Sequence, residues 1–166
     1  MSGAKHIVNL RDVPLEHHTH GEKFAAGYGH IAPLIGARLL GAGLHVVPPG
    51  KRAWPFHNHH VNEELFVILE GEGTVRIGEA EYPVRAGDVI GAPPGGKATA
   101  HQIINTSNAD LRYLCVSTMI RNEIVEYPDS GKVSAYVGKA PGGDDDAVSF
   151  SYRGKLVAPA EYWDGE

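Results

Sequence analysis

Cysteine is almost missing from this 166-residue sequence, whose single thiol is Cys115. One thiol excludes both an internal disulfide framework and a metal site built from several thiolates. The sequence also lacks any apolar run of about 18 residues, the length that a membrane-spanning helix needs. Residues 1–18 contain no continuous apolar run of signal-peptide length. We therefore expect a cytoplasmic protein with no membrane partner.

An excess of positive charge is also absent. The chain has 15 lysines and arginines against 20 aspartates and glutamates, for a formal net charge of -5. Without a basic stripe, a nucleic-acid surface is not expected, and no helix-turn-helix pattern precedes the apolar segments. A small-molecule substrate is the partner that we expect.

Helical periodicity is scarce, and short apolar segments separated by turns take its place. The 21 glycines and 11 prolines lie between these segments rather than in one block, which is typical of a chain with many short strands. The length of the chain favours one domain. The pattern predicts an all-β sandwich or barrel, with strands at residues 39–47, 65–69, 74–77, 81–84, 88–92, 98–105 and 111–119.

Four polar residues in and near these strands could bind one metal ion. His57 and His59 are two residues apart, so in extended backbone their side chains point to the same side. Glu64 opens the next strand, and His101 lies in a distant strand that a barrel can bring alongside. Three imidazoles and one carboxylate suit a divalent transition metal, with iron, manganese, zinc, nickel and cobalt all open. Glu63 is the alternative carboxylate, but it should face the opposite side of its strand.

The two parts of this constellation resemble the two signature motifs of the cupin superfamily. The run GKRAWPFHNHHVNEELFVILEG, residues 50–71, matches the glycines and ligands of the first motif, and GDVIGAPPGGKATAHQIIN, residues 87–105, matches the second. Two loops differ in length from the family pattern, because six residues separate Gly50 from His57 and five separate Gly95 from His101. The spacing within the ligand run at residues 57–64 follows the family, so the ligand assignment is kept.

The resemblance implies a single cupin domain over residues 1–166, folded as a jelly-roll or double-stranded β-helix barrel. The barrel core is expected at residues 38–118, after an N-terminal arm of strands and loop and before a C-terminal extension with several turns, residues 119–166. In that extension, the Gly-Gly-Asp-Asp-Asp run at residues 142–146 is expected to be an exposed acidic loop. The metal ligands that the resemblance implies are His57, His59, Glu64 and His101.

Alternation along the strands also predicts which side chains line the cavity. By this rule two apolar side chains share a face with Glu64, and one shares a face with His101. A histidine of an earlier strand could act as an acid or base. Together these form the predicted substrate-binding set: Phe66, Ile68, Ile103 and His45.

Two further clusters have simpler interpretations than a functional site. A phosphate group could meet a backbone nest at residues 95–97 or the pair Lys51–Arg52, but turns with solubilising charge explain both segments. A second histidine cluster lacks a carboxylate at the spacing of a metal site, and we expect no functional ion there: His17, His18 and His20.

The strand at residues 64–69 is largely apolar on both faces. A barrel wall that faces water needs one polar face, so another sheet, the N-terminal segment or a second subunit should cover the outside. A homodimer is the assembly that we expect.

The whole sequence is similar to small single-domain bacterial cupins labelled as sugar-phosphate isomerases. This resemblance implies a metal-dependent enzyme that isomerises a small oxygenated substrate, although a fold alone does not fix a function. Two alternatives remain open at this point. One is a non-haem Fe(II) dioxygenase that uses the same ligands, and the other is a non-enzymatic cupin that binds a small molecule or carbohydrate.

Overall fold

The computed structural model describes residues 6–140, 150–156 and 158–166, and its regular structure is dominated by strands. The acidic run at residues 142–146 lies outside the described residues. Within the described residues, no helix is long and apolar enough to cross a membrane. The all-β class expected from the spacing of the turns is confirmed.

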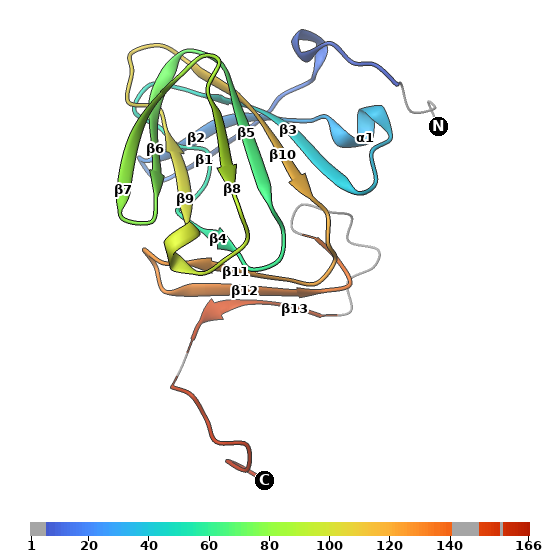
Figure 1. Cartoon of the computed structure of the whole chain (residues 1–166), viewed down its shortest axis with the longest axis vertical. Helices are drawn as coiled ribbons and strands as arrows, with labels where there is room; N and C mark the ends of the chain where they lie inside the picture. Colours follow the sequence, from blue (N-terminus) through green and yellow to red (C-terminus); the bar gives the residue numbers. More distant parts are fainter. Residues whose placement is uncertain (1–5, 141–149, 157) are drawn as a thin grey trace.

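The largest sheet has six antiparallel strands and forms one wall of a barrel (Figure 1). Its central strands come from distant parts of the chain, because β10 pairs with β3 on one side and with β5 on the other. In sheet order the strands are β1 (Glu16–His20), β2 (Phe24–His30), β3 (Leu40–Val47), β10 (Leu111–Thr118), β5 (Glu64–Glu70) and β8 (Val89–Ala92).

A three-stranded sheet forms the facing wall, in the order β7 (Ala80–Arg85), β6 (Glu72–Ile77) and β9 (His101–Ile104). Alternate side chains of the two walls point inward and pack against one another, as strand geometry requires. The buried cluster between them draws on both sheets and includes Val47, Phe66, Ile68, Val75, Ile90, Ile103, Leu111 and Tyr113. Removing these side chains from water provides the main driving force for closing the barrel.

The strand predicted at residues 98–105 is shorter in the structure. Residues Lys97–Thr99 form a 3-10 turn, and β9 begins only at His101. The backbone N–H and the hydroxyl of Thr99 both donate to the Gly96 carbonyl at 2.9 Å, which closes the chain into a turn after the glycine pair. The late start places His101 at the end of the barrel rather than in its middle.

A third sheet lies across that end of the barrel (Figure 1). Its order is β13 (Phe150–Lys155), β12 (Lys132–Val137), β11 (Glu123–Tyr127) and β4 (Asn58–His59). The C-terminal extension, expected to carry turns, therefore contributes three strands as well. The turn after Tyr127 closes with Gly131 at a φ of 64°, a conformation that glycine adopts without strain.

The N-terminal arm contains β1 and β2, a 3-10 turn at Leu10–Asp12 and the short helix α1 (Ala32–Ile35), which the sequence did not predict. Val13 and Ile31 pack with Leu44 in a second buried cluster. Leu44 points away from the barrel interior, since it pairs with Leu114 on the outer face. The arm therefore covers part of the outer face of the large sheet.

Candidate metal centre

Backbone pairing brings the two ligand-bearing segments together. The His57 N–H donates to the His101 carbonyl at 3.2 Å, and the His101 N–H donates to the His57 carbonyl at 2.8 Å. His59 lies two residues further on in β4, and Glu64 is the first residue of β5. The short strand β4 and the late start of β9 thus place residues far apart in the sequence at one end of the barrel.

The four side chains meet at one oxygen of Glu64. Its Oε2 lies 2.9 Å from Nε2 of His101, 3.5 Å from Nε2 of His59 and 3.9 Å from Nε2 of His57. The ligand atoms of His57, His59 and Glu64 are all within 4.8 Å of one another. Such spacing and such donors fit a divalent transition ion, whose ligand bonds are about 2.0–2.2 Å long. Among the described residues this is the group that could hold a metal.

The protonation states at the centre also suit a metal. Burial alone would raise the pKa of Glu64, but the hydrogen bond from His101 and the nearby imidazoles lower it to about 2. Burial, together with the neighbouring His101, lowers the pKa of His57 to about 4. Nδ1 of His57 lies 2.8 Å from the Pro55 carbonyl, which can only accept, so the ring turns an unprotonated Nε2 toward Glu64. At neutral pH the centre therefore presents a carboxylate and a neutral imidazole.

The second oxygen of Glu64 has a different partner. The Cys115 thiol donates to Oε1 at 3.5 Å. Burial, and after it the charge of Glu64, raises the pKa of this thiol well above its usual value, so it remains a protonated donor. Cys115 thus holds one carboxylate oxygen while the other faces the histidines.

Glu123 was missed by sequence analysis, although it is buried directly behind His59. Its carboxylate accepts from Nδ1 of His59 at 3.3 Å and from Nδ2 of Asn62 at 2.6 Å. It also accepts from three successive backbone N–H groups, at residues 60, 61 and 62, that lead toward Glu64. Burial alone would raise the pKa of Glu123, but the hydrogen bonds from His59 and Asn62 lower it below its usual range. A carboxylate in this position fixes the tautomer and orientation of a metal-binding histidine.

Three of the four predicted substrate-binding residues lie in the hydrophobic core. Phe66, Ile68 and Ile103 are all nearly inaccessible, with 6%, 1% and 5% of their surface exposed. The Phe66 ring is 5.3 Å from the His101 ring, so it packs beside the centre. Contact with substrate remains a prediction for all three residues.

The fourth predicted residue, His45, is buried among aromatic rings. Its Nε2 accepts from the Trp54 indole at 2.8 Å, and its ring stacks on Tyr113 at 4.6 Å. Burial lowers the pKa of His45 to about 3, so the imidazole is neutral at physiological pH. Its contact with substrate also remains a prediction.

The alternative of a phosphate nest at residues 95–97, which sequence analysis had ranked below simple turns, is not formed. The Gly95 N–H already donates to the His59 carbonyl at 2.8 Å, and neither Gly95 nor Gly96 has the positive φ that alternates in a nest. Lys51 is turned toward the N-terminal strands, where its Nζ donates to the Glu22 carbonyl at 2.6 Å.

The second histidine cluster does not converge. His17 and His18 are successive residues of β1 and point to opposite faces of the strand. The His18 ring stacks on Trp54 at 4.8 Å. His17 and His18 therefore cannot face a common ion, and His18 is engaged in aromatic packing.

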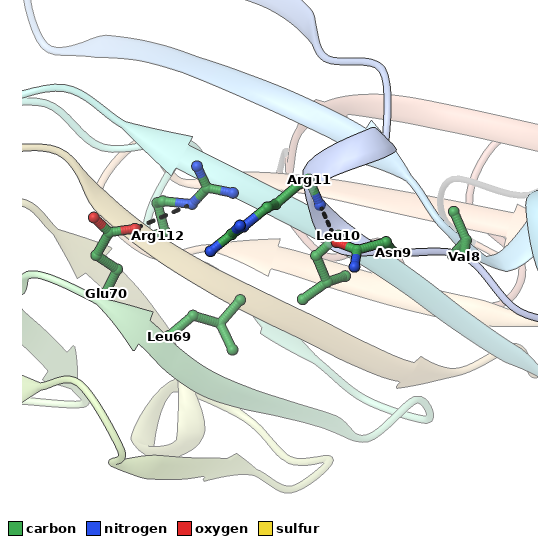
Figure 2. Close-up of a pocket in the computed structure, with 7 residues that line it drawn as sticks. All are labelled: Val8, Asn9, Leu10, Arg11, Leu69, Glu70 and Arg112. Carbon is green, nitrogen blue, oxygen red and sulfur yellow. Dashed lines mark hydrogen bonds and ion pairs between the residues drawn. The ribbon is translucent and has the colours of Figure 1, made fainter.

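A separate groove lies on the outer surface, away from all four candidate ligands. Figure 2 shows the N-terminal segment on one side of it and β5 and β10 on the other. Its volume is about 520 Å³, and Glu70 and Arg112 form an ion pair in its wall at 3.6 Å. The groove contributes nothing to the metal centre.

Comparison with known proteins identifies the barrel. The model of the family described as "Cupin domain" matches residues 43–117. The chain is 38% identical over 72 residues to an uncharacterised protein of Methanocaldococcus jannaschii and 35% identical over 74 residues to an oxalate-binding protein of Thermotoga maritima. These matches cover 43% and 45% of this chain and 54% and 58% of the relatives, so the chain spans about half the length of the curated relatives it matches.

A solved structure extends the likeness to nearly the whole chain. A protein of Acidithiobacillus ferrooxidans, provisionally named a sugar phosphate isomerase, superposes with a TM-score of 0.77 and 24% identity. The superposition covers 95% of this chain and 98% of that protein, so it includes the N-terminal arm and the C-terminal sheet. The chain therefore has the all-β cupin fold, and its residues 43–117 match the model of the cupin domain.

Proposed function

We propose that this cupin is a metal-dependent enzyme that isomerises a small oxygenated substrate, with sugar phosphates as the candidate class. The observation that carries the proposal is the convergence of three imidazoles on one oxygen of Glu64. The side chains of His57 and Glu64 keep 15% and 14% of their surface exposed, so the centre is not fully closed to solvent. Catalytic metals keep a coordination position free of protein ligands, and four protein ligands would leave such positions on an ion that prefers six.

A divalent ion held by His57, His59, Glu64 and His101 would supply a Lewis acid that polarises a carbonyl and lowers the pKa of a neighbouring hydroxyl. The chain supplies the conditions around it. Glu64, with a pKa of about 2, stays ionised throughout the physiological range. Burial of the ligands behind the barrel wall limits competition from water on that side.

The substrate class is the finer part of the proposal. A sugar phosphate offers an adjacent hydroxyl and carbonyl, the pair that such a centre can act on. The name of the Acidithiobacillus ferrooxidans protein suggests the same class, but at 24% identity that likeness establishes only the fold. The relative from Thermotoga maritima is named for oxalate binding, which favours a non-enzymatic ligand-binding role as the second candidate.

The test is an assay of aldose–ketose interconversion over a panel of sugar phosphates, with the metal-loaded protein under anaerobic conditions. We expect turnover that persists without oxygen and is lost on chelation or in the His101→Ala variant. Turnover that requires oxygen would instead support the dioxygenase alternative. Tight ligand binding with no turnover under either condition would support the binding role.

A further inference from the structure

In the C-terminal sheet, strands β11, β12 and β13 extend the face of β4 that carries His59. His59 in β4 is paired with Val125 in β11, Val125 with Ser134 in β12, and Ser134 in turn with Arg153 in β13. Paired residues of antiparallel strands point to the same side of a sheet. Arg153 therefore projects from the side of the sheet that carries His59.

A second set of paired residues on the same side of the sheet begins beside His57, another candidate ligand. The Tyr127 ring lies 6.2 Å from the His57 ring in a stacked orientation. Tyr127 is paired with Lys132, whose Nζ lies 5.3 Å from the centre of the tyrosine ring. Lys132 is paired in turn with Lys155 at the outer strand. Three cations thus share the metal-facing side of one sheet.

Arg153 is held in position by hydroxyl groups. Its Nε donates to Oγ of Ser134 at 2.9 Å, and its Nη2 donates to the Tyr136 hydroxyl at 2.7 Å. Both bonds point the side chain back from β13 toward the barrel. Strands in a sheet are about 4.8 Å apart, so the β13 backbone lies roughly 14 Å from β4 and the guanidinium bridges part of that distance.

The charges of these three residues lack a carboxylate partner within the described residues. In the described part of the chain, no carboxylate forms an ion pair with Lys132, Arg153 or Lys155. Arg76 provides a contrast near the same turn, because it is paired with Asp129 at 2.9 Å. Such a cationic cluster in a protein of net charge -5 indicates a site for an anion.

We propose that Lys132 and Arg153, supported by Lys155, bind the phosphate group of a substrate whose hydroxyl and carbonyl groups lie at the metal centre. The inference rests on the proposed function and adds a location for the phosphate. Chemistry supports this ligand, because the planar guanidinium matches phosphate oxygens in a bidentate geometry and an ammonium adds a point charge. The substrate extends from His57 past Tyr127 toward β13.

The experiment measures binding of inorganic phosphate to the metal-free, full-length chain by calorimetry at low ionic strength. Metal-free protein is used so that phosphate cannot bind to the ion itself. We expect Lys132→Gln and Arg153→Gln each to weaken phosphate binding about tenfold, since each removes a charge-assisted contact. Arg85→Gln is the matched control, because Arg85 is exposed on β7, outside the C-terminal sheet, and should change nothing.

Zinc affinity is measured separately for all four proteins and should be equal in them. Absence of phosphate binding by the wild type, or equal binding by the Lys132, Arg153 and Arg85 variants, would overturn the phosphate site whatever the zinc result. Failure of every protein to bind zinc would instead refute the metal centre on which the proposed function depends. The two failures are therefore distinguishable.

Discussion

Two successive carboxylates, Glu63 and Glu64, lie at the start of β5, and their side chains point to opposite faces of the strand. Glu64 turns inward and gathers three imidazoles around Oε2, whereas Glu63 is exposed. Alternation along a strand predicts this difference from the sequence. The pair also provides a matched test of the centre.

Glu64→Gln should reduce zinc affinity by about a hundredfold or more, because loss of a ligand exceeds the 10–100-fold effect of changing an outer-shell partner. Glu63→Gln should leave the affinity unchanged. Calorimetry of zinc binding and metal analysis of the purified variants provide the measurement. Equal loss in both variants, or loss only in Glu63→Gln, would contradict the ligand assignment.

Glu123 should control how metal binding depends on pH. Burial alone would lower the pKa of His59, but the hydrogen bond that His59 donates to Glu123 and the charge of Glu64 raise it above its usual value. A proton on His59 competes with the ion, so zinc affinity should fall about tenfold per pH unit below that pKa. Glu123→Gln removes the negative partner, lowers the pKa of His59 and moves this fall to lower pH.

Zinc titrations between pH 5 and 8 measure the shift in Glu123→Gln. The affinity above the transition should also drop, by about tenfold, since the imidazole loses its orienting carboxylate. Glu81→Gln serves as the control, because Glu81 is exposed on β7, in the sheet that does not contain β4. A transition that stays at the wild-type pH would show that Glu123 only supports the loop.

Three of the four candidate ligands could be predicted from the sequence because their spacing is local, whereas His101 was assigned from its place in the second motif. His57, His59 and Glu64 lie within eight residues of one another, and strand parity fixes where they point. Glu123 could not be found in this way. Its position depends on the pairing of β11 with β4, and it lies 64 positions after His59 in the sequence.

At the scale of the element, the strands of the barrel were predictable, whereas those of the C-terminal sheet were not. β3, β5 and β10 begin and end within one residue of their predicted bounds, because long apolar runs end at clear turns. β13 at the sheet edge is exposed along almost its whole length. An edge strand with little burial has no strong periodic pattern, so only turns could be predicted in this region.

Two motif glycines differ in what their turns demand. Gly71, between β5 and β6, has a φ of +83°, and a Cβ there would lie 2.5 Å from the Asp110 carbonyl oxygen. Gly50 has a φ of +72°, but a Cβ there would meet nothing within 4 Å. The first turn requires both the backbone conformation and the space, and the second requires only the conformation.

Gly50→Ala should therefore cost about 1–2 kcal/mol of unfolding free energy from backbone strain alone. Gly71→Ala should cost about 3 kcal/mol or more, because a clash with rigid backbone adds to the strain. Urea unfolding of the two variants measures the difference. Equal destabilisation would mean that the Asp110 segment moves aside without cost.

At the scale of the whole molecule, the outer face of the large sheet is only partly covered. The N-terminal arm packs over Leu44 and Leu114. Beyond it, Leu65 and Val89 remain 41% and 62% exposed on neighbouring strands. We propose that a second copy of the chain covers this remaining surface, as expected from the two apolar faces of β5.

Light scattering after size exclusion should then give the mass of a dimer. A double variant, Leu65→Lys with Val89→Lys, should give a monomer that still binds zinc, because lysines cannot be buried unpaired in an interface. Ile124→Lys on the C-terminal sheet is the control and should remain dimeric. A wild-type monomer at micromolar concentrations would rule out this assembly.

The thiol beside Glu64 bears on how the protein withstands oxidants. Peroxide attacks thiolates rather than thiols, and stepwise oxidation of a cysteine ends in an irreversible sulfonic acid. The raised pKa of Cys115 keeps its sulfur in the slow-reacting form. A redox-active ion could therefore occupy the neighbouring site without oxidation of Cys115, whose thiol donates a hydrogen bond to Glu64.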